Sequence, residues 1–271
     1  MMYKITRWIA LSFFSLLILI PSTMVFLGSF KSDLEIYDSP MALPVKWTLN
    51  NYQRLLDDGD ILINFKNSII VTFFSVVITL LLASMVSFAI ARLMNVTGKV
   101  LFVLFSLGLA IPGQVNIIPI YLLFSDLGLT NTYHGLIAVN IVATLPISVF
   151  ILTSFFRELP NEMYEVASID GASHFRVFRS IAVPLSRPAL GATSIFLFVI
   201  CWNDLLFPLL LITESAKKTL PLAMLDYRGE YATSFSMIFT AVMVASIPMV
   251  VMYLAMQKSF VAGLTAGAVK G

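Results

Sequence analysis

Six long runs with almost no charged residues constrain the fold of this chain more than any other feature. Five of them contain no Asp, Glu, Lys or Arg, and the sixth is interrupted by one acid, Asp204. A helix needs about 20 apolar residues to cross a bilayer. A spanning segment must be a helix or part of a closed barrel, because lipid offers no partner to backbone N–H and C=O groups. The runs are too long for barrel strands and predict an all-α integral membrane protein with six transmembrane helices. The predicted spans are residues 8–30, 68–90, 100–125, 135–156, 188–213 and 235–257.

The composition agrees with a membrane protein. The chain is 59% hydrophobic and 12% charged, whereas soluble domains average about 45–50% and about 25%. Lys4 and Arg7 precede the first run, as in a signal peptide, but the run exceeds the usual apolar core of about 7–15 residues. We therefore expect a retained first helix. The single cysteine, Cys201, lies within the fifth predicted span, where we expect it to pack as a small apolar residue.

Basic residues in the loops predict the orientation of the chain. With six spans both termini lie on one side, which carries ten Lys and Arg residues and four acids, against seven and ten on the other side. We therefore expect cytoplasmic termini, a cytoplasmic segment 157–187 and an extracytoplasmic loop 31–66. That loop is polar, with a short helix expected around Asn51–Leu56. It is either a solvated connection or a docking surface for an extracytoplasmic partner. The second external loop, Glu214–Glu230, is shorter and mixed in charge.

The sequence supplies little for catalysis or cofactor binding. It has two histidines and no His, Cys and Glu cluster at metal-ligand spacing. Ser173 lies beside His174 in "GASH", but adjacent residues make a poor catalytic pair, so a catalytic role is not expected. The C-terminal "GLTAGAVKG" lacks the spacing of a phosphate-binding loop. We expect no cofactor on this chain, and any ATP hydrolysis must be supplied by another chain.

Polar residues interrupt the fifth run in "WNDLLFPLLL". Asn203 and Asp204 either hydrogen-bond a neighbouring helix or line a polar pathway. Aromatic side chains beside them suit sugar rings, although in a span such residues more often serve packing. A secondary, ion-coupled transporter is the alternative function, but a lone intramembrane acid and no visible internal repeat give it little support.

The segment 157–187 predicts two short helices joined at an elbow. Pro160 and Asn161 precede "EMYEVASID", which predicts a helix capped by Asn161 with acids in its first turn. Gly171 then permits a sharp change of direction. A second helix is expected over 173–183, with an apolar stripe of Phe175, Phe178 and Ile181. This geometry suits either a rigid knob for a partner's cleft or an amphipathic loop lying on anionic headgroups.

The same segment resembles the cytoplasmic EAA loop of ABC importer permeases. The matching residues are Glu165, Val166 and Ala167, then Asp170, Gly171 and Ala172, and later Ile181, Ala182, Val183 and Pro184. The sequence departs from the family pattern at Val166, where alanine is usual, and at Val183, where leucine is usual. "LPVKWTLNNYQRLL", "WNDLLFPLLL" and the tail "FVAGLTAGAVKG" resemble the carbohydrate-uptake branch, in the subunit similar to the smaller maltose-type permease.

The resemblance implies a type I ABC importer permease in the inner membrane of a bacterial cell, importing a carbohydrate or related polyol. It implies a heterodimer with a second permease subunit, two ATPase subunits that bind ATP and magnesium, an extracytoplasmic solute-binding protein, lipid contacts and no nucleic acid. The residues expected to couple to the ATPase are Glu165, Ala167, Ser168, Asp170, Gly171, Ala172, Phe175, Ile181 and Pro184. Those expected along the substrate pathway are Trp202, Asn203, Asp204 and Phe207.

Overall fold

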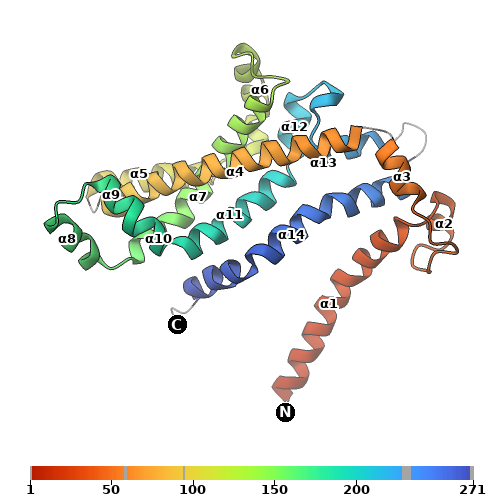
Figure 1. Ribbon diagram of the computed structural model, residues 1–271, viewed down its shortest axis with the longest axis horizontal. Helices are drawn as coiled ribbons and strands as arrows, with labels where there is room; N and C mark the ends of the chain where they lie inside the picture. The colour runs from red at the N-terminus through yellow and green to blue at the C-terminus, as the bar shows by residue number, and fades with distance from the viewer. Residues whose placement is uncertain (1, 58–59, 94, 228–232, 269–271) are drawn as a thin grey trace. The chain divides into compact units, whose positions relative to one another are not determined.

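The computed structural model describes residues 2–57, 60–93, 95–227 and 233–268, with side chains described as far as residue 257 (Figure 1). Its named elements are helices. They are α1 (Met2–Gly28), α2 (Asp33–Asp38), α3 (Asn50–Asp57), α4 (Asp60–Arg92), α5 (Val96–Gly108), α6 (Ile117–Asp126), α7 (Tyr133–Glu158), α8 (Asn161–Ile169), α9 (His174–Val177), α10 (Val183–Leu185), α11 (Arg187–Trp202), α12 (Leu206–Leu211), α13 (Leu220–Ala223) and α14 (Phe235–Ala268). Short 3-10 turns cover Gly113–Asn116, Ser215–Lys217 and Met224–Tyr227, and a π-helical turn covers Phe178–Ala182.

The predicted all-α membrane architecture is confirmed. Within the described residues, four helices are long and apolar enough to cross a membrane, and six segments qualify if each of two bent pairs forms one span. The unbroken candidates are the helices α1, α4, α7 and α14. The bent pairs join α5 to α6, with an angle of 81°, and the α9–α10 segment to α11, with an angle of 78°.

Two of the six apolar runs are therefore not single helices, contrary to the expectation of one helix in each run. The run 100–125 is divided where Pro112 takes an extended conformation, with ψ 130°, between α5 and a 3-10 turn. Proline has no N–H to donate and restricts the residue before it, which favours a break. The run 188–213 is divided between α11 and α12 at Asn203–Leu205.

The chain forms two compact units, and α4 and α14 each contribute residues to both. Unit 1 comprises Met1–Phe65 and Lys218–Met249. In it, the buried Lys31 ammonium donates to the Ser39 carbonyl at 2.8 Å, and the Asn51 amide donates to the Lys31 carbonyl at 2.8 Å. The Asp33 carboxylate accepts from the Ser236 N–H at 2.7 Å. These bonds fold the loop 31–66 against its own unit.

The helix α3 confirms the short helix expected around Asn51–Leu56. Parts of three other sequence predictions lie outside the described residues. These are positions 58–59 of the loop 31–66, positions 228–230 of the second external loop, and positions 269–271 of the C-terminal tail.

Unit 2 comprises Lys66–Lys217 and Val250–Gly271. Its helix α7 packs against α5, α11 and α12, and Figure 1 shows α7 beside α5 and α11. The main apolar core is built at one end of this unit from α4, α7, α8 and the segment that follows α8. Phe88 and Phe156 lie within it, with ring centroids 6.0 Å apart. This core supports the candidate coupling segment.

Candidate functional site

The first candidate site is the elbow between α8 and α9. Gly171 has φ +71°, in the left-handed region that glycine adopts without strain. Its N–H donates to the Ser168 carbonyl at 3.1 Å, and the Ala172 N–H donates to the Ala167 carbonyl at 2.9 Å. This pair of bonds is a Schellman motif, which ends a helix and turns the chain. The predicted elbow at Gly171 is therefore confirmed in its geometry.

The first helix of the elbow begins differently from expectation, and the second begins where it was expected. Pro160, not Asn161, occupies the N-cap position of α8, and no side chain caps it. The Asn161 side-chain oxygen instead accepts a hydrogen bond from Arg92 at 3.0 Å, so the predicted Asn cap is wrong. Ser173 caps α9, because its hydroxyl accepts from the Arg176 N–H at 3.3 Å. This serine therefore has a structural role in the elbow.

The second helix of the elbow continues past Pro184, beyond the end expected at residue 183. Its residues run without a gap through a π-helical turn at Phe178–Ala182 and on through Pro184 to Leu185. Proline is tolerated here because it lies in the first turn of α10, near the change of helix type. The chain bends after Leu185, before α11 begins at Arg187.

One face of the elbow packs into the core of unit 2. Tyr164, Ala167, Val177 and Ala182 are buried there together with Phe88. The Phe88 ring lies 6.1 Å from that of Tyr164 and 5.3 Å from that of Phe178, measured between centroids. Aromatic pairs at such separations stabilise a core beyond the area they bury. The elbow is thus packed against α4 through the Phe88 ring.

Arg92, at the last position of α4, ties that helix to α8. Its guanidinium carbon lies 3.9 Å from the centroid of the Tyr164 ring, a cation–π contact. Burial raises the pKa of the Tyr164 phenol above its usual range, and the Arg92 charge partly offsets this rise.

The rest of the elbow is exposed and carries both apolar and charged side chains. Ile169 is 84% exposed, Phe175 62% and Val166 59%. Glu165, Ser168, Asp170 and Gly171 are exposed as well. Of the expected stripe, Phe178 and Ile181 pack against the core, and the exposed Phe175 ring lies 6.4 Å from the Phe178 ring, measured between centroids. The π-helical turn over Phe178–Ala182 changes the helical spacing on which the predicted stripe depended.

The second candidate site is the break between α11 and α12. The Asp204 carboxylate, one residue before the N-cap Leu205, accepts from the N–H groups of Leu206 (3.1 Å) and Phe207 (3.4 Å) at the start of α12. The Asn203 amide donates to the Val199 carbonyl at 2.8 Å, and its side chain is exposed. Within unit 2, these polar groups replace the helical bonds that are missing at the break.

The aromatic side chains at the break are buried in protein and do not face a solvent-accessible pathway. Trp202 is 3% exposed and stacks on Phe198, with centroids 5.6 Å apart and planes at 11°. Phe207 is also buried. Of the four residues predicted for a substrate pathway, only Asn203 presents an exposed side chain. Cys201 is buried beside them, as expected of a small apolar residue.

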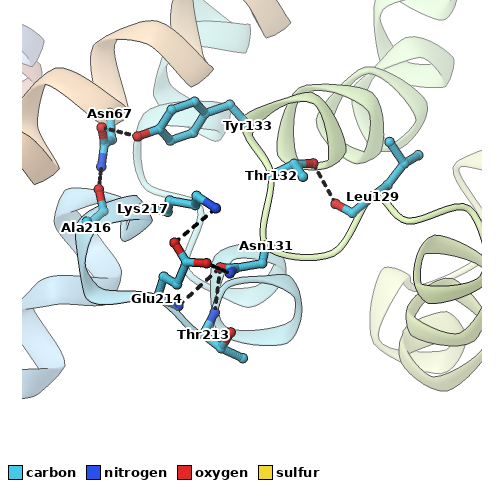
Figure 2. Close-up of polar contacts among 9 residues, drawn as sticks. All are labelled: Asn67, Leu129, Asn131, Thr132, Tyr133, Thr213, Glu214, Ala216 and Lys217. Atoms are coloured by element: carbon cyan, nitrogen blue, oxygen red, sulfur yellow. Dashed lines mark hydrogen bonds and ion pairs between the residues drawn. The ribbon is translucent and has the colours of Figure 1, made fainter.

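Figure 2 shows a third polar cluster, which joins α4, α7 and the loop after α12. The Asn67 amide accepts from the Tyr133 hydroxyl at 2.8 Å and donates to the Ala216 carbonyl at 2.9 Å. Asn131, with φ 57°, donates to Glu214 and accepts from the Glu214 N–H at 3.1 Å. The hydrogen bonds of this cluster connect three segments that are distant in sequence. Sequence reasoning missed it, because Asn131 and Glu214 belong to no local motif.

Residues 83–264, more than half of the chain, match the family of binding-protein-dependent transport system inner membrane components. The chain belongs to this family. The match includes both the elbow and the break.

Similar proteins agree with this membership. The trehalose/maltose transport system permease protein MalG of Thermococcus litoralis is 34% identical over 261 residues, which cover 95% of this chain and 93% of the relative. The diacetylchitobiose uptake system permease protein NgcG of Streptomyces coelicolor is 33% identical, with 93% and 84% covered. A chain of a bacterial ABC transporter that imports the acidic polysaccharide alginate superposes with a TM-score of 0.83, at 21% identity and 96% coverage of both chains. The chain therefore has the type I ABC importer permease fold.

Groups that could hold a metal are missing from the described part of this permease, where no three His, Cys, Asp or Glu side chains come together. The residues that sequence reasoning overlooked at the elbow are Arg92 and Phe88. Arg92 could have been noticed in the sequence, because it ends a long apolar run, but residue spacing alone could not show that it contacts Tyr164 in α8. Phe88 had no signal, because it is one apolar residue among many in α4.

Proposed function

We propose that the chain is a permease subunit of an ATP-driven importer for a carbohydrate or related polyol, and that the elbow couples it to a separate ATPase. The observation that carries this proposal is the two-sided elbow. One face is fixed to the core through Tyr164, Ala167 and Val177, and the other exposes Val166 and Ile169. A rigid helix pair with an exposed apolar surface suits insertion into a cleft on a partner.

In this proposal the partners are a second permease subunit, two ATPase subunits and an extracytoplasmic solute-binding protein. Binding of ATP and magnesium, and hydrolysis, belong to the ATPase. The exposed residues of the elbow contact the ATPase, with Glu165 and Asp170 at the polar edge of the surface. Gly171 and Ala172 hold the turn, and Ile181 and Pro184 brace the second helix. The charge distribution supports cytoplasmic termini in an inner-membrane protein.

The polar break between α11 and α12 is the proposed part of the substrate pathway. Backbone that is not helical at membrane depth is tolerated where it lines a cavity or is buried in protein. Asn203 and Asp204 offer amide and carboxylate groups to sugar hydroxyls, while Trp202 and Phe207 pack beneath and keep the break in shape. The sugar-importing relatives support the substrate class.

The test is co-purification followed by transport. The chain is expressed with its neighbouring permease and ATPase genes, purified through a tag on this chain, and placed in vesicles with the binding protein. We expect the ATPase to co-purify and ATP-dependent uptake of trehalose, maltose or a related sugar. Val166→Glu with Ile169→Glu should abolish ATPase retention, whereas Leu34→Glu, exposed on α2 outside the predicted spans, should leave it intact. Sugar uptake by the chain alone on an ion gradient would contradict the proposal.

A further inference from the structure

Two cavities in unit 2 meet at the end of α4 beside the elbow. The first, of about 360 Å³, is lined by Arg92, Lys99, Arg157 and Asn161 together with neighbouring apolar residues. The second, of about 440 Å³, is lined by the apolar residues Met85, Phe88, Ala89, Phe175 and Phe178, with His174 at its wall. Arg92 and Leu93 line both cavities. A polar, cationic space and an apolar space therefore share one wall.

The cations of the first cavity come from three separate elements. Arg92 ends α4, Lys99 lies in α5 and Arg157 lies at the end of α7. No carboxylate is among the described residues that line this cavity. Like charges gathered in one space repel each other, and the repulsion is relieved when an anion occupies that space. The cavity is therefore complementary to a negatively charged group.

Ring contacts hold two of these cations in place. The Arg92 guanidinium lies 3.9 Å from the Tyr164 ring and that of Arg157 lies 4.7 Å from the Phe102 ring, measured to the centroids. A guanidinium has five N–H donors in its plane. Stacking on a ring uses the face of the group and leaves its edge for hydrogen bonds; one N–H of Arg92 donates to Asn161 at 3.0 Å, and its other N–H groups are left for further acceptors. Two pre-positioned guanidinium edges and a lysine suit the oxygens of a phosphate.

We propose that the two cavities together form a binding site for one anionic phospholipid. Its phosphate binds Arg92, Lys99 and Arg157, and an acyl chain passes Leu93 into the apolar cavity. Basic pockets between transmembrane helices on the cytoplasmic side bind anionic headgroups in other membrane proteins. An acidic protein surface also matches the three cations, but the adjoining cavity of about 440 Å³, lined by Met85, Phe88 and Ala89 of α4, is large enough for part of an acyl chain. The shared wall at Arg92 and Leu93 therefore favours a lipid.

The site has a mechanical consequence for the elbow. Asn161 lines the cationic cavity, and His174, Phe175 and Phe178 line the apolar one, so elbow residues contribute to both. A lipid bound here contacts α4 and the elbow at once. Its occupancy braces the elbow against α4 and so makes the stiffness of the elbow depend on the lipid composition of the membrane.

The test measures lipid retention by the purified full-length chain in native mass spectrometry, with phosphatidylglycerol or phosphatidylcholine of identical acyl chains added. We expect tighter retention of phosphatidylglycerol. Lys99→Gln and Arg157→Gln should each weaken it about fivefold, the effect of removing one basic residue near an anionic headgroup. Lys99→Arg should retain it. Arg179→Gln, which removes an exposed cation that lines neither cavity, is the matched control and should change nothing.

Several results would overturn the site. These are equal retention of the two lipids, an equal loss in Arg179→Gln, or unchanged retention in the Lys99→Gln, Arg157→Gln double variant. If that double variant keeps the lipid and also fails to retain the ATPase when the complex is co-purified, the cavity faces the ATPase instead. A melting temperature close to that of the wild type shows that the variants are folded. Because the readout is lipid bound to this chain alone, its failure leaves the proposed transport function untouched.

Discussion

Gly171 allows the sharpest test of the elbow, because its role can be separated from packing. A Cβ built on Gly171 meets no atom within 4 Å, so a side chain there has room. The cost of a substitution is therefore conformational. An L-residue in the left-handed region costs about 1–2 kcal/mol. Such a difference changes an equilibrium between turned and unturned elbow roughly 5- to 30-fold.

The expected order follows from how each residue tolerates φ +71°. Gly171→Asn should be mild, because asparagine adopts this region more readily than other non-glycine residues. Gly171→Ala should be intermediate and Gly171→Val the most severe, because a β-branched residue is a genuine outlier there. The chain offers two matched controls. Gly113 has equal space and no positive φ, and Gly128 has equal space and φ +66° outside the elbow.

The assay measures ATP-dependent uptake and binding-protein-stimulated ATP hydrolysis in vesicles that contain the assembled complex. Coupling should fall in the order Gly, Asn, Ala, Val at position 171. Hydrogen exchange over residues 161–185 should rise in the same order. Gly113→Ala should be silent, and Gly128→Val should lower thermal stability without uncoupling hydrolysis from uptake. Wild-type coupling in Gly171→Val, or equal losses in the Asn and Val variants, would refute the reasoning.

Substitutions at four further positions probe the packing and the polar groups. Phe88→Ala should destabilise the chain by about 3–5 kcal/mol, because it removes a ring from a buried cluster, and Phe88→Leu should cost less; thermal unfolding in detergent checks both. Asn203→Ala should alter the concentration dependence of uptake without lowering the melting temperature. Asp204→Ala should lower the melting temperature, because it removes hydrogen bonds at the start of α12 that are worth about 1 kcal/mol, as a helix cap is. Unchanged uptake in both variants would remove the two residues from the substrate pathway. Asn131→Ala should loosen the cluster of Figure 2 and raise hydrogen exchange over residues 212–217, while Asn131→Gly, which keeps the left-handed backbone, should loosen it less.

Much of the architecture could be predicted from local sequence. Long apolar runs identify membrane helices, because lipid cannot hydrogen-bond a bare backbone, and this requirement acts on each segment separately. Gly171 could be placed at an elbow for a similar reason, since the left-handed conformation is a property of one residue. The short helix α3 was also predictable from its own residues.

The contacts that make the elbow rigid depended on tertiary structure. Arg92 contacts Tyr164 and Asn161, which are distant from it in sequence. The hydrogen bond to Asn161 occupies the side chain that was predicted to cap α8. Helical periodicity predicted the apolar stripe, but periodicity does not say which neighbour covers each of its side chains. Only packing against Phe88 decided that Phe178 turns inward, while Phe175 stays exposed. Backbone requirements are local and can be read from the sequence, whereas the pairing of side chains from distant segments exists only once the helices have packed.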